Sequence, residues 1–148
     1  MSKQIDPRGP RFGAAITTVV VAVALAGIHS GTGANNTLSF VLLTVQLVAH
    51  GLGTFVGLSA QPYGIAYRKF VAPKLNKPSE LEDENPPRFA QFVGFLFAAA
   101  ALVALLLGAT VAAQIIVALH LAASFLNAVF DFCLGCQMYL IGKRILNN

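Results

Sequence analysis

The only two cysteines of the chain, Cys133 and Cys136, stand three positions apart in the segment FCLGCQMY near the C-terminus. Cysteines at positions i and i+3 share a helix face or flank a turn, close enough to bond to each other or to bind one soft metal ion. Asp131 precedes the pair by two positions and is a candidate proton acceptor. The spacing alone leaves three reactions open: dithiol–disulfide exchange, persulfide carriage, and binding of copper or zinc.

The position of the pair in the chain affects this chemistry. We expect the cysteines at the C-terminal end of the last membrane helix, where the helix dipole and the Asp131 carboxylate both disfavour a thiolate. This argues against a strongly oxidising site, unless Gly135 interrupts the helix and Lys143 or Arg144 folds back. A reducing cytoplasm is expected to keep the two thiols free, which favours a reductant or a sulfur carrier over an oxidase.

Two apolar segments each carry a polar stripe at helical spacing. The stripes consist of Gln46, His50, Gly53 and Gly57, and of His120, Ser124, Asn127 and Asp131. Counting from the segment ends places His50 and His120 near the bilayer midplane. Polar side chains at that depth are costly and normally face the bundle interior, so we expect the two stripes to meet.

The histidine stripes admit three interpretations. In the simplest, hydrogen bonds hold the helices together while Gly51, Gly53 and Gly57 allow a close approach. In the second, the stripes form a polar pathway or binding site for protons, a quinone headgroup or another small ligand. In the third, His50 and His120 hold a haem, because two neutral imidazoles from opposed helices are suitable axial ligands. Two histidines without further haem-specific residues are weak candidates for cofactor binding.

The elements that carry these residues are membrane helices. Hydrophobic residues make up 56% of the 148 positions and charged ones 11%, against roughly 25% charged residues in soluble domains. About 20 mainly apolar residues span a bilayer, and four segments qualify: residues 12–29, 38–58, 89–107 and 111–132, the last with a C-terminal extension. We therefore predict one all-α membrane domain over residues 1–148 with four transmembrane helices. A cleaved signal peptide is the alternative for the first segment.

The distribution of charge predicts the orientation. All 10 Lys and Arg residues precede the first helix, lie in the loop 59–88, or follow the fourth helix. The positive-inside rule then places both termini and this loop in the cytoplasm, and residues 29–37 and 108–110 outside. The net charge of +4 indicates anionic lipid headgroups as partners and no nucleic acid. The loop segment YGIAYRKFVAPKL is expected to form an interfacial helix that ends at Pro73.

Two segments of the chain recur. Pro10-Arg11-Phe12 returns as Pro87-Arg88-Phe89, and residues 57–65 resemble residues 133–141, at offsets of 77 and 76 positions. The agreement predicts two parallel helical hairpins related by a pseudo-twofold axis along the membrane normal. In this alignment the cysteines stand where the first copy has Gly57 and Ala60, so the thiol pair is a feature of one half only.

With these motifs in place, the chain resembles the bacterial DUF4395 family of small four-helix membrane proteins. The resemblance rests on the entry Asp6-Pro7-Arg8 and on the FCxGC segment at residues 132–136. It implies a multi-pass protein of the bacterial plasma (inner) membrane, associated with thioredoxin-like and sulfur-transfer proteins, and gives a role only to Cys133, Gly135 and Cys136. Quinone-linked thiol oxidoreductases of four-helix type are a looser analogy, since their cysteine pair faces the outside.

The sequence thus favours a membrane-integral dithiol protein in thiol redox or sulfur transfer, with Cys133 and Cys136 as the pair and Asp131 as proton acceptor. Its partner would be a thioredoxin-like protein or a sulfurtransferase on the cytoplasmic side. One alternative is a non-catalytic accessory subunit of a larger membrane complex, such as a respiratory one. Another is the handling of copper or zinc by the two cysteines. Whether the protein is an enzyme stays open, as does binding of quinone, haem or copper.

Overall fold

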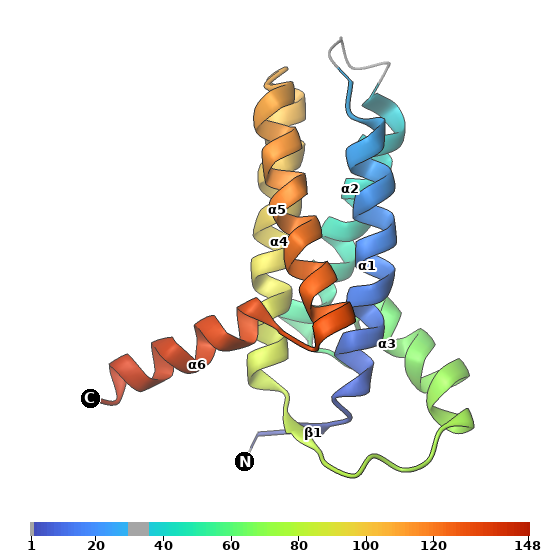
Figure 1. Ribbon diagram of the computed structural model, residues 1–148, viewed down its shortest axis with the longest axis vertical. Helices are drawn as coiled ribbons and strands as arrows, with labels where there is room; N and C mark the ends of the chain where they lie inside the picture. Colours follow the sequence, from blue (N-terminus) through green and yellow to red (C-terminus); the bar gives the residue numbers. More distant parts are fainter. Residues whose placement is uncertain (1, 30–35) are drawn as a thin grey trace.

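Four long helices form the body of the molecule (Figure 1) in the computed structural model, which describes residues 2–29 and 36–148. They are α1 (Arg8–Gly27), α2 (Thr37–Gly51) with its π-helical continuation η2 (Leu52–Val56), α4 (Asn85–Leu106) and α5 (Thr110–Phe130). Each is long and apolar enough to cross a membrane. The prediction of an all-α membrane protein with four spans is confirmed. Most of the predicted outer segment 29–37 lies outside the described residues.

The helix boundaries differ from the predicted ones at both ends. Helices α1 and α4 begin at Arg8 and Asn85, each four residues before the predicted start. Both contain proline in the first turn, where the missing N–H has no helical partner and costs nothing. Helix α5 ends at Phe130, so the predicted span 111–132 was too long.

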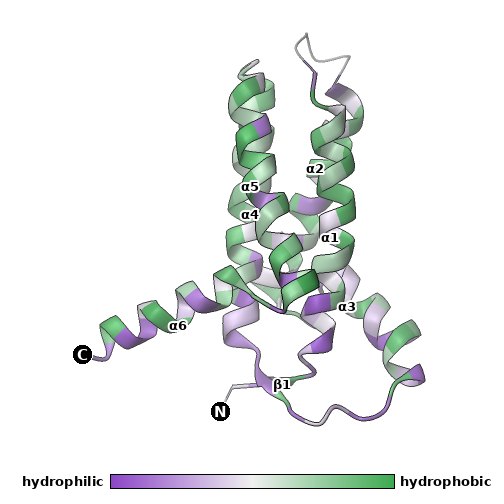
Figure 2. Cartoon of the chain, viewed as in Figure 1, coloured by the Kyte–Doolittle hydropathy of each residue, from purple (hydrophilic) through white to green (hydrophobic). Residues whose placement is uncertain are grey.

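The helices form a ring in which α1 packs against α2 and α5, and α4 packs against the same two helices. Small and branched apolar side chains fill the centre: Val21, Ala24, Leu43, Ala101 and Val117. Large apolar side chains such as Phe55, Leu106 and Val111 are more than 60% exposed on the outside. Figure 2 shows that hydrophobic residues predominate along the long helices. A bundle that is apolar both inside and outside is what a lipid environment requires.

Both termini and the central loop lie at one end of the bundle (Figure 1). There β1 (Gln4–Ile5) pairs antiparallel with β2 (Glu82–Asp83). A helical segment follows α2 and leaves the bundle sideways; it consists of α3 (Pro62–Ala66), η3 (Tyr67–Val71) and η4 (Ala72–Lys74). The helix predicted up to Pro73 is therefore present. Helix α6 (Leu134–Leu146) follows α5 and leaves on the other side of the bundle. The assignment of this end to the cytoplasm stays a prediction.

The repeated arginines occupy corresponding places in the two hairpins. Arg11, at the start of α1, donates to the carbonyls of Ala128 and Val129 at the end of α5, at 3.0 and 3.2 Å. Arg88, at the start of α4, donates to the carbonyls of Thr54 and Phe55 at the end of η2, at 2.8 and 3.4 Å. Each arginine thus caps the final carbonyls of the other hairpin, which carry the negative end of the helix dipole.

The strand pairing follows the same relation. Ile5 pairs with Glu82, which stands 77 positions later in the chain, the same offset that separates the two arginines. An antiparallel pair in which a residue faces its own counterpart is what a twofold axis produces. These contacts support the predicted duplication, which itself stays a prediction.

Candidate functional site

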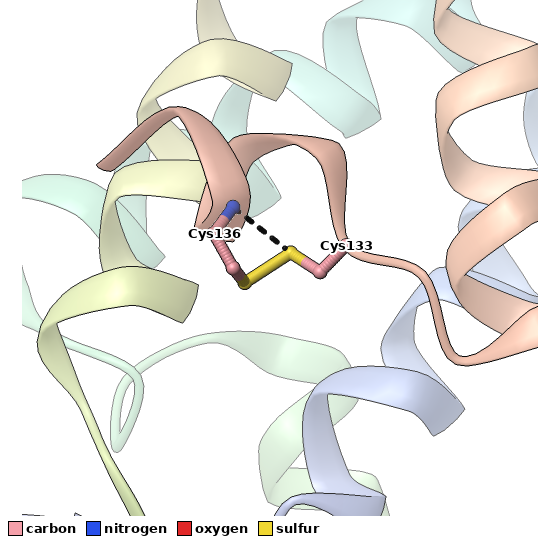
Figure 3. Close-up of a disulfide and its surroundings, with 2 residues drawn as sticks. All are labelled: Cys133 and Cys136. Carbon is pink, nitrogen blue, oxygen red and sulfur yellow. Dashed lines mark hydrogen bonds between the residues drawn. A yellow bond between two sulfur atoms is a disulfide. The ribbon is translucent and has the colours of Figure 1, made fainter. Parts of the chain in front are cut away.

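Cys133 and Cys136 form a disulfide at the start of α6 (Figure 3). Their Cα atoms lie 5.2 Å apart, and both residues are half-buried. Cys133 is the N-cap of α6, and its Sγ atom accepts a hydrogen bond from the backbone N–H of Cys136 at 3.3 Å. The expectation of two free thiols is therefore wrong for this structure, because the spacing brings the sulfurs within bonding distance.

Asp131 creates this arrangement by ending α5. Its φ of 54° and ψ of 30° lie in the left-handed region, and among the described residues it is the one non-glycine with positive φ. The N–H groups of Asp131 and Phe132 both donate to the carbonyl of Leu126, which closes the helix end. The chain then extends through Cys133 and starts α6 at Leu134. The helix is thus interrupted at Asp131 and not at Gly135, the position that the sequence had left open.

This break reverses the electrostatic argument made from the sequence. The cysteines do not end a helix; they begin one, with Cys133 at the N-cap and Cys136 in the first turn. Unpaired N–H groups and the positive end of the helix dipole stabilise a thiolate at this position. The expectation that the dipole disfavours a thiolate is therefore wrong.

Gly135 fixes the start of α6 against α4. It is buried, and a Cβ atom at this position would lie 2.6 and 2.7 Å from the Cα and Cβ atoms of Ala90. One turn further on, the Tyr139 ring packs at 5.9 Å from that of Phe89. The absence of a side chain at Gly135 thus allows the disulfide to lie directly beside the membrane bundle.

Asp131 and the basic residues Lys143 and Arg144 were also considered from the sequence as groups that could act on the thiols. Asp131 is exposed two positions before Cys133, and its carboxylate has no hydrogen bond or ion pair within residues 2–29 and 36–148. The carboxylate is therefore accessible at the protein surface. Lys143 and Arg144 stand in the last turn of α6, at the end that points away from the bundle (Figure 1), so neither folds back toward the sulfurs.

The two polar stripes meet inside the bundle, as predicted. The rings of His50 and His120 lie 5.3 Å apart, and Phe97 stacks on the other side of His120 at 5.6 Å. The Nδ1 atom of His50 is 2.7 Å from Oε1 of Gln91. Gly94 makes room for this arrangement, because a Cβ atom there would lie 2.8 to 2.9 Å from three atoms of the His50 ring.

Gln91 and Gly94 were not identified from the sequence as part of this site. They stand three positions apart and therefore share a face of α4. Such a short polar and glycine stripe is the signal that could have revealed them. Both residues decide how His50 is held, one by a hydrogen bond and the other by leaving space for the ring.

The histidine pair does not fit the geometry of haem ligation. Two axial imidazoles bind the iron from opposite faces of the porphyrin, with metal–nitrogen bonds of about 2 Å each. The His50 and His120 rings are instead tilted by 48° and in contact, with no space for a porphyrin between them. Across the described residues no three His, Cys, Asp or Glu side chains group as a metal site, and the two sulfurs are bonded to each other.

A cavity of about 390 Å³ connects the two sets of residues. It lies among α1, α4, α5 and α6, and its lining includes His50, His120, Gln91 and Cys133. A separate cavity of about 250 Å³ lies between the N-terminal segment and α3, and Gln91 also borders this one. The sequence predicted the histidine stripes and the cysteine pair, but not that one cavity touches both.

A hydrogen-bonded group of polar side chains borders the second cavity. Asp6 binds Arg8 through two side-chain atoms and accepts a hydrogen bond from the Tyr67 hydroxyl at 2.8 Å. The bonds from Arg8 hold the pKa of Asp6 below its ordinary value. Burial, reinforced by the Asp6 carboxylate, raises the pKa of Tyr67. The Asp-Pro-Arg motif thus forms a charged, hydrogen-bonded group at the start of α1, where it contacts Tyr67.

Comparison with known proteins identifies the family. The family model described as "Domain of unknown function (DUF4395)" matches residues 5–144, so the chain belongs to this family. No curated protein and no solved structure matches the chain.

Proposed function

We propose that this DUF4395 protein is a membrane-integral thiol–disulfide oxidoreductase in which Cys133 and Cys136 exchange electrons with a dithiol partner. The observation that carries the proposal is the disulfide at the N-terminus of α6, half-exposed and next to the bundle. The positive-inside rule would place this exchange at the cytoplasmic surface of a bacterial plasma membrane. A thioredoxin-like protein has the chemistry that this site would recognise.

Reduction of the pair would follow the usual exchange steps. A partner thiolate attacks Sγ of Cys133, the disulfide breaks, and Cys136 leaves as a thiolate that takes up a proton. The second partner thiol loses its proton to a base, a role suited to the exposed Asp131 carboxylate. It then attacks the partner's own sulfur in the mixed disulfide, and Cys133 leaves. Two electrons have then passed from the partner dithiol to the pair.

The helix terminus assists the second of these steps. The Cys133 thiolate that leaves keeps the hydrogen bond from the Cys136 N–H, 3.3 Å away in the oxidised form. A stabilised thiolate is a better leaving group. The same group is the nucleophile when the reaction runs in reverse, from the protein to a partner disulfide.

Sulfur transfer would need a persulfide on one cysteine that survives until it meets an acceptor. A persulfide on Cys133 would lie within reach of Cys136, which would displace the outer sulfur and restore the disulfide. The short spacing therefore favours electron exchange over sulfur carriage. The accessory-subunit and soft-metal alternatives require no redox change at these residues.

A redox titration of the purified full-length protein tests the proposal. Alkylation with a mass-tagged maleimide at increasing ratios of reduced to oxidised dithiothreitol should give one two-electron transition, absent in Cys133→Ser/Cys136→Ser. In intact cells, a membrane-impermeant maleimide should label the thiols only after the membrane is opened, if the pair faces the cytoplasm.

Other outcomes would overturn the proposal. A pair that stays oxidised in excess reduced dithiothreitol cannot accept electrons from a dithiol partner. An accessory subunit would co-purify with a larger complex in fixed ratio, and the double serine variant would leave that complex and its activity unchanged. A metal-handling protein would retain about one equivalent of copper or zinc after dialysis in the reduced state.

A further inference from the structure

The cavity beside the disulfide has the size and composition of a small-molecule site. Its volume is about 390 Å³, within the range of roughly 300 to 1,000 Å³ that ligand sites occupy. Apolar side chains such as Phe97, Leu119 and Met138 form much of the wall. The polar lining residues include His50, His120, Ser124, Asn127 and Cys133.

Two buried ring nitrogens, in residues that line this cavity, have no hydrogen-bond partner among residues 2–29 and 36–148. They are Nε2 of His50 and Nδ1 of His120, in residues that are only 6% and 4% exposed. Inside a bilayer no bulk water can satisfy them, and each unsatisfied group is costly. Because the two rings adjoin at 5.3 Å, one ligand could lie beside both residues, its carbonyl oxygen accepting from Nδ1 of His120 when that nitrogen carries the ring proton.

The hydrogen bond to Gln91 defines what kind of partner His50 needs. Oxygen Oε1 of Gln91 can only accept, so Nδ1 of His50 carries the ring proton. In the neutral ring, Nε2 is then an acceptor. The missing partner of His50 is therefore a donor, such as a hydroxyl group.

The cavity also has a wall that faces the surrounding lipid. Leu119 and Met138 both line it, and they are 55% and 54% exposed on the outer surface. A ligand can therefore enter from the bilayer and leave an apolar tail there. A lipophilic ring with oxygen atoms fits these walls better than a water-soluble, charged compound.

We infer that this cavity binds a lipophilic quinone that accepts the electrons of the reduced Cys133–Cys136 pair; the inference rests on the proposed function. The two S–H bonds break and one S–S bond forms. Two electrons and two protons pass to the two carbonyl oxygens of the quinone, which leaves as a hydroquinone. One new hydroxyl group donates to Nε2 of His50. The partner dithiol then reduces the disulfide again.

Decylubiquinone is a suitable probe, because its fully substituted ring cannot be arylated by thiols. The full-length protein in lipid nanodiscs is reduced with dithiothreitol and desalted, and hydroquinone formation is followed by ultraviolet absorbance. Binding is measured independently by ultrafiltration with the oxidised protein. The wild-type protein should bind about one equivalent and, once reduced, produce about one hydroquinone per disulfide formed.

Two variants address the site in different ways. His120→Phe keeps the ring that stacks on Phe97 and removes both nitrogens. Ala123→Phe fills part of the cavity from α5. Each should raise the dissociation constant and slow electron transfer by about tenfold, the equivalent of one hydrogen bond or a comparable loss of packing.

The control variants replace the same residue types, alanine and histidine, at positions outside the cavity. Ala118→Phe places the ring on the exposed face of α5, outside the cavity, and His29→Ala removes an exposed histidine that follows the end of α1. Both should leave quinone binding and electron transfer unchanged. All four variants should keep the dithiothreitol titration of the wild type.

The outcomes separate this inference from the proposed function. A pair that titrates with dithiothreitol but reduces no decylubiquinone overturns the quinone site and leaves thiol exchange intact. Wild-type behaviour in both His120→Phe and Ala123→Phe overturns the location of the site. Quinone binding by a pair that no thiol can reduce overturns thiol exchange, and with it the electron transfer inferred here.

Discussion

The two hairpins end in helices of similar position and different chemistry. In the first, Gly57 ends the membrane helix with φ 129°, and Gln61 caps the following helix by accepting the N–H of Gly64 at 2.6 Å. In the second, Asp131 ends the helix and Cys133 caps the next one through the N–H of Cys136. By its place in the structure, Gln61 is therefore the counterpart of Cys133, although the repeated sequences align Cys133 with Gly57.

This comparison explains how a structural element can become a redox site. Both caps accept a hydrogen bond from the N–H three residues later, so the same backbone geometry serves an amide oxygen and a sulfur. The link from the end of the membrane helix to the cap is two residues shorter in the second hairpin. The sulfurs are thereby brought close to the bundle and its cavity.

The interior shows a second difference between the halves. Thr17 in α1 is buried at 3% exposure and stands 77 positions before Gly94 of α4. Where the first half has a side chain, the second has an empty position that the His50 ring fills. The two halves therefore differ at this position, and the space left by Gly94 in the second half receives the His50 ring of the first.

The largest expected effect concerns the contact that holds α6 of the second half against α4. Gly135→Ala forces a Cβ atom against the backbone of Ala90 and should destabilise the protein by about 3 kcal/mol, the upper range for overpacking. Gly142→Ala on the same helix meets nothing within 4 Å and should be neutral or stabilising. Thermal unfolding in detergent measures both. Equal effects would show that α6 does not depend on its contact with α4.

The arginine caps should differ in strength. Arg88→Ala removes two hydrogen bonds, one of them part-buried, and should cost about 2 kcal/mol, as expected for charged hydrogen bonds. Arg11→Ala, whose bonds are exposed, should cost about half as much. Denaturant or thermal unfolding of both variants, with Lys69→Ala as a control for the loss of charge, tests the order. A larger loss of stability for Arg11→Ala than for Arg88→Ala would contradict the predicted order of the two caps.

Moving the cysteines to the first hairpin tests which residues correspond. In a Cys133→Ser/Cys136→Ser background, Gln61→Cys/Gly64→Cys should form a disulfide. Gly57→Cys/Ala60→Cys should form little and destabilise the protein by about 1 to 2 kcal/mol, since Gly57 has a φ that L residues rarely adopt. Intact mass after alkylation, with and without reduction, gives the result. The reverse outcome would restore the alignment of Cys133 with Gly57.

The smallest expected effect concerns the acids before each hairpin. Asp6 and Asp83 both accept the N–H two residues later, but only Asp6 also holds an arginine and a tyrosine. Its pKa is lowered chiefly by Arg8, so its contribution is present above the unfolded pKa near 3.8 and disappears as the pH falls through the folded value. Asp6→Asn should cost about 1 kcal/mol at pH 7 and remove part of the acid sensitivity.

The corresponding control is Asp83→Asn. Backbone bonding to Asn85 lowers the pKa of this exposed carboxyl, and its loss should change thermal stability less than that of Asp6. Unfolding temperatures between pH 3 and 7 compare the two variants. If Asp6→Asn changes nothing across that range, the Asp-Pro-Arg motif has no electrostatic role in stability.

Much of the fold follows from the sequence, because four runs of apolar residues can only be helices in a bilayer. Helical spacing likewise brings His50 and His120 together. The break at Asp131 could not be predicted in this way, since the apolar run continues through Phe132 and an aspartate seldom adopts the left-handed conformation. The direction of the electrostatic effect on the cysteines depends on that single residue, and so does the contact of Cys133 with the cavity.

The paired arginine caps have a mechanical consequence for the protein in its membrane. Each guanidinium group is tied to the helix ends of the opposite hairpin, so neither can extend freely to reach the headgroups. Tilting the whole bundle would pull one of them toward hydrocarbon, where a cation costs roughly 2.5 to 3.5 kcal/mol. The two arginines are therefore expected to resist tilting of the bundle and to hold it at a constant depth in the bilayer.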